Sequence, residues 1–199
     1  MKLGILDYGC GNLKSLHNSL VYLGYEVVYV DQENIFDDFD TIILPGVGAF
    51  ETAIKNLKDS GLFHDLKEIA QTKTKIIGIC LGMQILMSTS YEFGEHIGLD
   101  IVKGSVQPFK ESNGFKIPHM GWNNIKTNNE RFLENQADYY FVHSYFVQLE
   151  NKEEELFKTE YGLEFTSGIY RHPNIFGVQF HPEKSQKSGL SLLKKMIEC

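Results

Sequence analysis

The sequence has few cysteines, few prolines and no long apolar run. Its 199 residues contain three cysteines, at positions 10, 80 and 199, and five prolines. An odd and widely spaced set of cysteines does not form a disulfide framework, so each is reactive or simply buried. No window approaches the roughly 20 apolar residues that span a bilayer, and the start MKLGILDYG lacks a signal-length apolar stretch. We therefore expect a cytoplasmic protein.

Positive charge is also scarce. Lysine and arginine total 19 against 26 acidic residues, giving a net charge of -7. This balance disfavours a surface that follows a phosphate backbone, so nucleic acid is not an expected partner. With 42% hydrophobic and 23% charged residues, the chain can build a substantial core, and its length fits a single domain over residues 1–199. A small acidic enzyme that acts on a metabolite is the simplest expectation.

The first half of the chain alternates short apolar runs, turns and helical patterns. We expect strands at Lys2–Asp7, Glu26–Val30, Thr41–Leu44 and Lys75–Ile79, and helices at Asn12–Leu23, Ala53–Leu57, Leu62–Ala70 and Gly82–Met87. Such alternation predicts an α/β fold with a mostly parallel, open sheet flanked by helices.

The second half carries many short strand patterns instead. Asn113-Gly114 predicts a hairpin turn between Val102–Phe109 and Phe115–Ile117. Further strands are expected at Trp122–Ile125, Tyr139–Val142, Phe146–Leu149, Leu156–Thr159, Phe165–Ile169 and Ile175–Phe180, before a final helix near Gln186–Ile197. No linker separates the halves, so we expect an antiparallel extension of the parallel sheet.

The strongest chemical signal is Gly78-Ile79-Cys80-Leu81-Gly82, between an apolar strand and a helix. A glycine-flanked nucleophile at that junction predicts an elbow that lifts the side chain above the carboxyl edge of the sheet. We expect the glycines to avoid collisions with the substrate, and the helix N-terminus to favour the thiolate. The same five residues are also compatible with a small buried cysteine at a tight turn.

A thiol nucleophile needs a base, and the base needs an orienting group. In Gln179-Phe180-His181-Pro182-Glu183, the histidine and glutamate are two apart at the end of an expected strand. In extended geometry their side chains leave on the same side, so the carboxylate can fix the imidazole tautomer. A lone histidine here is more often structural, but the pairing and the upstream elbow favour catalysis.

Pro45-Gly46-Val47-Gly48 follows the third expected strand. Its glycines let backbone N–H groups turn toward a substrate oxygen, as an oxyanion hole for acyl transfer requires. Without the elbow beside it, this segment would read equally well as a plain strand-to-helix turn.

Together these motifs resemble the class I, or triad, glutamine amidotransferases, whose fold is flavodoxin-like. The elbow and the Gln179–Glu183 segment carry the resemblance to the superfamily. Other segments are similar to the branch that supplies the glutaminase subunit of imidazole glycerol phosphate synthase, and the resemblance spans residue 3 to about 193. They are Asp7–Leu13, Leu44–Phe50, Pro118–Asn123, Tyr140–Tyr145 and Lys184-Ser185.

The resemblance implies a role for each matching residue. Cys80 would form a thioester with glutamine, His181 would transfer protons, and Glu183 would hold His181. The implied oxyanion donors are Gly46, Val47, Gly48 and Leu81; the implied glutamine contacts are Gly48, Gln84, Glu92, His143, Ser144 and Tyr145. Asn12, Trp122, Tyr140 and Lys184 would face the partner. No cofactor or metal is implied.

The implied partner is a cyclase subunit with a (β/α)8 barrel, forming a heterodimer. It would receive ammonia and produce imidazole glycerol phosphate and AICAR in histidine biosynthesis. A paralogous glutaminase that feeds ammonia to a surface-sugar amidotransferase remains an alternative.

Other classes fit less well. A dinucleotide site would use Gly9-Cys10-Gly11 and Asp31, but Lys14 stands where the third glycine is needed. A γ-glutamyl peptide hydrolase or a deglycase-like protein would keep the same chemistry, yet the Pro118–Asn123 and Tyr140–Tyr145 segments disfavour both. The complete Cys-His-Glu set disfavours an inert binding subunit.

Overall fold

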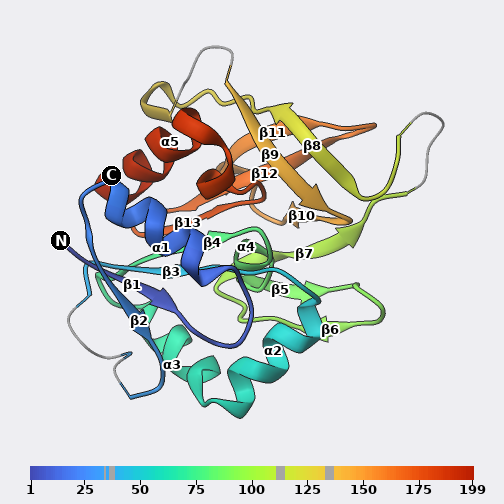
Figure 1. Cartoon of the computed structure of the whole chain (residues 1–199). Coiled ribbons are helices and arrows are strands. Elements are labelled where there is room, and N and C mark those ends of the chain that lie inside the picture. The colour runs from blue at the N-terminus through green and yellow to red at the C-terminus, as the bar shows by residue number, and fades with distance from the viewer. Residues whose placement is uncertain (34, 36–38, 111–114, 133–136) are drawn as a thin grey trace.

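The computed structural model describes residues 1–33, 35, 39–110, 115–132 and 137–199, and its backbone is organised around one long sheet (Figure 1). Half of this sheet is parallel, in the order β2-β1-β3-β4-β13. These strands are β1 (Lys2–Leu6), β2 (Glu26–Val30), β3 (Thr41–Leu44), β4 (Lys75–Ile79) and β13 (Ile175–Val178). The strand that lies beside β4 therefore comes from near the end of the chain.

The other half of the sheet extends β13 through β12, β10, β7, β5 and β6, with antiparallel pairing except between β5 and β7. The strands are β5 (Met87–Ser90), β6 (His96–Ile97), β7 (Val102–Pro108), β10 (Tyr145–Leu149), β12 (Glu164–Arg171) and β11 (Glu155–Glu160), which pairs with β12. β8 (His119–Asn124) and β9 (Asp138–His143) form a separate two-stranded ribbon. The predicted α/β class, a mostly parallel sheet with an antiparallel extension, is confirmed.

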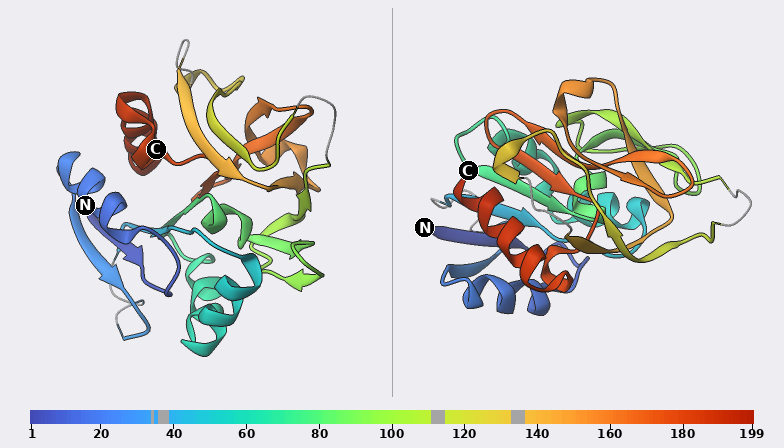
Figure 2. Two further views of the ribbon diagram at one scale, coloured as in Figure 1. Left: turned by 45° about the vertical axis from the view of Figure 1, so that its right-hand side comes forward. Right: turned by 90° about the horizontal axis from the view of Figure 1, so that it is seen from above.

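Helices cover both faces of the parallel half (Figure 2). α1 (Leu13–Tyr22) and α5 (Gln186–Glu198) pack in a core with Ile5, Ile43 and Ile77, while α2 (Phe50–Asp59) and α3 (Leu62–Ile69) pack in a core with Leu6, Ile42 and Leu44. Successive strand residues thus enter opposite cores, as the twofold period of a strand requires. None of the helices in the described ranges is long and apolar enough to cross a membrane.

Four sequence expectations need correction or fall outside the described part. The helix expected over Gly82–Met87 is the single turn α4 (Leu81–Gln84), because Met87 already begins β5. The strands β5 and β6 were not predicted. The predicted turn Asn113-Gly114 lies outside the described residues, and β7 pairs with β10 and β5 rather than with Phe115–Ile117.

Candidate active site

Cys80 sits on a strained elbow between β4 and α4. Its backbone has φ 54 and ψ -109, a left-handed conformation that non-glycine residues rarely adopt. Its side chain is largely buried, with 7% of the residue exposed. Because α4 has four residues, the sulfur stands at the start of a single helical turn rather than of a long helix dipole.

The elbow glycines are needed for packing within the protein. A Cβ on Gly78 would lie 2.6 Å from the carbonyl oxygen of Gly82, and a Cβ on Gly82 would lie 1.9 Å from that of Leu44. The sequence argument expected a collision with the substrate, and the structure instead places the collision with neighbouring backbone.

Replacement of Gly82 by alanine is expected to lower the free energy of unfolding by about 3 kcal/mol or more, because the elbow and β3 must separate. Urea unfolding followed by circular dichroism measures this. Gly24→Ala is the matched control, since Gly24 has φ +90 but nothing described within 4 Å of an added Cβ. Gly24→Ala should lower the free energy of unfolding only by the cost of its strained backbone. An equal loss of stability in the two variants would contradict a collision between residue 82 and Leu44.

The pairing of β13 with β4 brings the histidine motif to the elbow. Val178 stands opposite Ile79 in the register, and the N–H of Cys80 donates to the carbonyl of Val178 at 2.7 Å. Since both strands are parallel, the residues that follow each of them lie at one edge of the sheet. Cys80 and His181 therefore line the same cavity.

His181 and Glu183 form a buried pair. Nδ1 of His181 lies 2.9 Å from Oε1 of Glu183, which fixes the ring orientation. The geometry is not the extended one expected, because Glu183 lies in the 3-10 turn η3 (Pro182–Lys184) that His181 begins. The Nε2 atom of His181 is buried and has no hydrogen-bond partner among the described residues, so it is available for proton transfer.

The surroundings of His181 favour its protonated form. Burial alone would lower its pKa, but contacts with Cys80 and Glu183, two groups that become negative, raise the pKa to about 10. A proton taken from a thiol is therefore held readily on this imidazole.

The Pro45–Gly48 segment runs alongside the elbow. A Cβ on Gly46 would lie 2.7 Å from Cβ of Leu81 and 2.8 Å from the nitrogen of Gly82, so Gly46 must be a glycine. The hydroxyl of Tyr8 donates to the carbonyl of Pro45 at 2.5 Å. By contrast, Gly48 has φ +113 and no described atom within 4 Å of an added Cβ. The segment is therefore closely packed at Gly46, whereas the space beside Gly48 is open.

A cavity of about 500 Å³ opens in front of the sulfur, a size suited to a small metabolite. All of the expected glutamine-binding residues line this cavity. Phe93, Pro118 and Val142 line it as well, although the sequence argument did not select them. Its lining is Val47, Gly48, Cys80, Leu81, Gln84, Glu92, Phe93, Pro118, Val142, His143, Ser144, Tyr145 and His181. The carboxylate of Glu92 also accepts the backbone N–H of Phe50 at 2.5 Å, at the start of α2.

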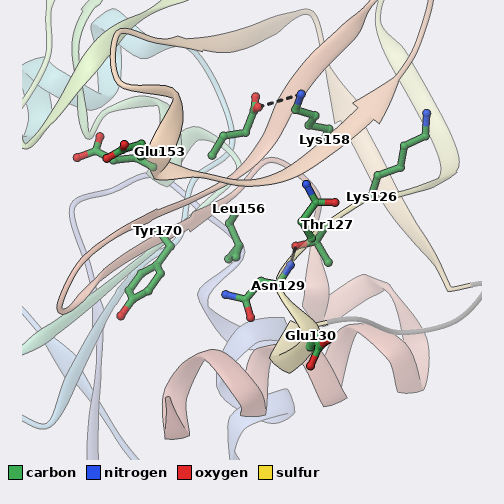
Figure 3. Close-up of a pocket in the computed structure, with 11 residues that line it drawn as sticks. Lys126, Thr127, Asn129, Glu130, Glu153, Leu156, Lys158 and Tyr170 are labelled. Carbon is green, nitrogen blue, oxygen red and sulfur yellow. Dashed lines mark hydrogen bonds and ion pairs between the residues drawn. The ribbon is translucent and has the colours of Figure 1, made fainter.

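A second, more polar groove of about 740 Å³ lies away from these residues, between the segment around Lys126 and the β11 region (Figure 3). Lysine and glutamate side chains of opposite charge line it, including the ion pair of Lys158 with Glu155 at 3.3 Å. It shares no lining residue with the cavity at Cys80.

None of the four expected partner-facing residues is among those that line the cavity at Cys80. Trp122 and Tyr140 are opposite each other in the β8–β9 ribbon, with ring centroids 5.9 Å apart, and Trp122 is 49% exposed. Lys184 is exposed in η3. The side chain of Asn12 accepts the N–H of Ser15 as the cap of α1, so this residue has a local structural role as well.

The junction of β4 with β13 defines a cysteine hydrolase of the α/β class, because a thiol and an imidazole line one cavity there and the carboxylate of Glu183 pairs with that imidazole. The comparisons with known proteins agree. Residues 4–198 match the family Glutamine amidotransferase class-I. The chain is 46% identical to imidazole glycerol phosphate synthase subunit HisH of Carboxydothermus hydrogenoformans, and 43% identical to subunit HisH 2 of Methanococcus maripaludis. Each alignment covers 98% of this chain and 98% of the relative.

Among solved structures, the fold is similar to PurLQS from Thermotoga maritima, with a TM-score of 0.75 and 18% identity over 99% of this chain and 97% of that one. The chain belongs to the class I glutamine amidotransferases, in the branch of the HisH subunits, and is a glutaminase. Its first glycine-rich loop is packed against the Pro45–Gly48 segment rather than open for a dinucleotide, since a Cβ on Gly11 would lie 3.1 Å from Pro45.

Proposed function

We propose that Cys80, His181 and Glu183 hydrolyse glutamine and that the ammonia passes to a cyclase subunit with a (β/α)8 barrel. The observation that carries this proposal is the parallel pairing of β4 with β13, which sets the thiol of Cys80 and the imidazole of His181, paired with Glu183, on one cavity of about 500 Å³. The whole chain would act as one glutamine amidotransferase domain of the cytoplasm.

The reaction divides into two acyl transfers. His181 Nε2 takes the thiol proton, and the resulting thiolate of Cys80 attacks the carboxamide carbon of glutamine. The imidazolium then gives a proton to the departing ammonia, and a thioester remains. In the second half, His181 draws a proton from water, which releases glutamate and regenerates the thiol. Glu183 keeps the imidazole oriented in both halves.

The remaining cavity residues bind and polarise the substrate. Backbone N–H groups of Leu81 and of Gly46, Val47 and Gly48 would stabilise the developing oxyanion, and Val47, Gly48 and Leu81 line the cavity. At the other end of the cavity, the carboxylate of Glu92 suits the α-ammonium of glutamine. Further polar groups that line the cavity would bind the rest of the substrate, and they belong to Gln84, His143, Ser144 and Tyr145.

The β8–β9 ribbon would dock the partner. Its exposed Trp122 and the adjacent Tyr140 offer an aromatic contact, the kind of residue that dominates binding energy at interfaces. The N–H of His181 donates to the carbonyl of Tyr140 at 2.9 Å, so the docking strand also supports the base. Asn12 and Lys184 would extend this face.

The isolated chain is expected to hydrolyse glutamine slowly. Addition of the cyclase and its ribonucleotide ligand should raise kcat by about 10²–10³, the value of one correctly aimed oxyanion donor, with less change in KM. The physical reason is that Gly48 can reorient at little steric cost. Steady-state glutamate release, measured for the chain alone, with cyclase, and with cyclase and ligand, tests this.

The same assay separates the alternatives. Glutamine-dependent production of imidazole glycerol phosphate supports the proposal. Activation by a sugar amidotransferase instead of the cyclase would identify a paralogue, and full activity of the chain alone on γ-glutamyl peptides would identify a peptide hydrolase.

A further inference from the structure

Gln179 contacts the sulfur of Cys80 from inside the protein. It follows β13 directly and is fully buried, at 0% exposed. Its Nε2 atom lies 3.6 Å from Sγ of Cys80, and its backbone N–H donates to the carbonyl of Ser167 at 2.9 Å. Gln179 is not among the residues that line the glutamine cavity, so it approaches the nucleophile from within the protein core.

The orientation of this amide follows from the hydrogen bonds around it. The carbonyl oxygen of Tyr145 can only accept, so the Gln84 atom 3.1 Å away must be the donor Nε2. The same Nε2 lies 3.0 Å from the Gln179 side chain, which must present its oxygen there. The other end of the Gln179 amide, facing Cys80, is therefore an N–H donor.

The carbonyl of Tyr145, which sets this orientation, accepts a hydrogen bond from the buried His143, and His143 in turn contacts the buried His119. Nδ1 of His143 donates to Tyr145 at 2.8 Å, and Nε2 of His143 lies 2.9 Å from Nδ1 of His119. Because Nδ1 of His143 donates to Tyr145, its Nε2 must accept from Nδ1 of His119, and a second proton on His143 would place two donors face to face. Burial agrees with neutral rings, since it lowers the pKa of His143 to about 3 and that of His119 to about 4. The carbonyl of Tyr145 therefore accepts the same hydrogen bond from His143 throughout the neutral pH range.

We propose that Gln179 is a further catalytic residue, which donates a hydrogen bond to the sulfur of Cys80 and stabilises it as a thiolate. The inference rests on the proposed role of Cys80. The thiol proton goes to Nε2 of His181, and Gln179 keeps both of its own protons, so it acts on charge alone. Hydrogen bonds to charged groups are stronger than those to neutral ones, so the donor stabilises the thiolate more than the thiol.

Replacement of Gln179 by leucine in the complex is expected to lower kcat for glutamine by about 10- to 100-fold, the value of one hydrogen bond to a charged acceptor. KM should stay unchanged, because Gln179 does not line the cavity. The ultraviolet absorbance of the thiolate, measured against Cys80→Ala as background, should fall at neutral pH. Synthesis from ammonium salts should be unaffected.

Gln179→Glu provides a second variant of nearly the same shape. Its carboxylate places negative charge beside the sulfur, so its kcat should fall further than that of Gln179→Leu. Thr159→Val is the matched control, because it removes another fully buried hydrogen-bonding group, whose hydroxyl bonds Asn124 and Ser167. It should lower the melting temperature without changing kcat or the thiolate signal.

Wild-type kcat and thiolate absorbance in either folded Gln179 variant would overturn the inference. A raised KM with unchanged kcat would do the same, since it would make Gln179 a support of the substrate site. Hydrolysis that survives Cys80→Ala would instead overturn the proposed function itself, so the two failures are distinguishable.

Discussion

Replacement of Cys80 by alanine is expected to abolish glutamine hydrolysis and to leave synthesis from ammonium salts intact. The sulfur is the atom that would form the thioester, and it faces the cavity beside His181. The acceptor reaction would belong to the partner, which needs ammonia but not its source. Glutamate release and product formation should be measured on the same complex, first with glutamine and then with an ammonium salt.

The second buried cysteine offers the control. Cys10 is 8% exposed, lies 3.6 Å from Nδ2 of Asn56 and does not line the cavity, so Cys10→Ala should retain both reactions. Loss of both reactions in a folded Cys80→Ala complex would argue against separate sites for ammonia release and ammonia use.

Local patterns in the sequence were enough to predict the parallel half of the sheet. Apolar runs of four or five residues mark β1, β2, β3 and β4 within one residue of their observed bounds, and a helical period follows each of them except β2. The elbow was predictable for the same reason, since a strand, a glycine-flanked nucleophile and a helix stand next to one another in the chain. Periodicity is a strong signal where the structure it reports is local.

The strands β5 and β6 carried no such signal. β5 reads MSTS, with polar side chains and partial exposure, and β6 has two residues. β5 pairs with β7, which lies later in the chain, and β6 joins the sheet only by pairing with β5. For Glu183 the sequence predicted the partner but not the geometry, since Glu183 lies in a short turn rather than in an extended strand and still meets His181.

The hydrogen-bond network behind the sulfur is of the same kind. Gln84, Tyr145 and Gln179 come from three separate segments, and they meet because β13 pairs with β4 while β10 joins the antiparallel extension. The sequence motif containing Gln179 could be recognised, but the direction of its amide depends on which atoms surround it. Residue identity was therefore predictable, whereas the contact with Cys80 was not.

Replacement of His181 by alanine is expected to lower kcat for glutamine by about 10²–10⁴-fold, because one imidazole would serve as both base and acid. Glu183→Gln should cost less. Its amide oxygen can still accept the Nδ1–H that now lies 2.9 Å from Oε1 of Glu183, so the ring keeps its orientation. Steady-state glutaminase rates of the activated complex give the comparison, with His172→Ala as a control histidine that does not line the cavity.

The two variants should differ in electrostatics as well as in rate. In the unmodified chain, burial lowers the pKa of His181 while Cys80 and Glu183 raise it, to about 10 in all. A neutral amide at position 183 removes one of the two raising contributions, so the pKa of His181 should fall in Glu183→Gln, which NMR titration of the ring would detect. An unchanged pKa would mean that Cys80 alone sustains the charge on the imidazole. A rate lower in Glu183→Gln than in His181→Ala would mean that the carboxylate, rather than the imidazole, transfers the proton.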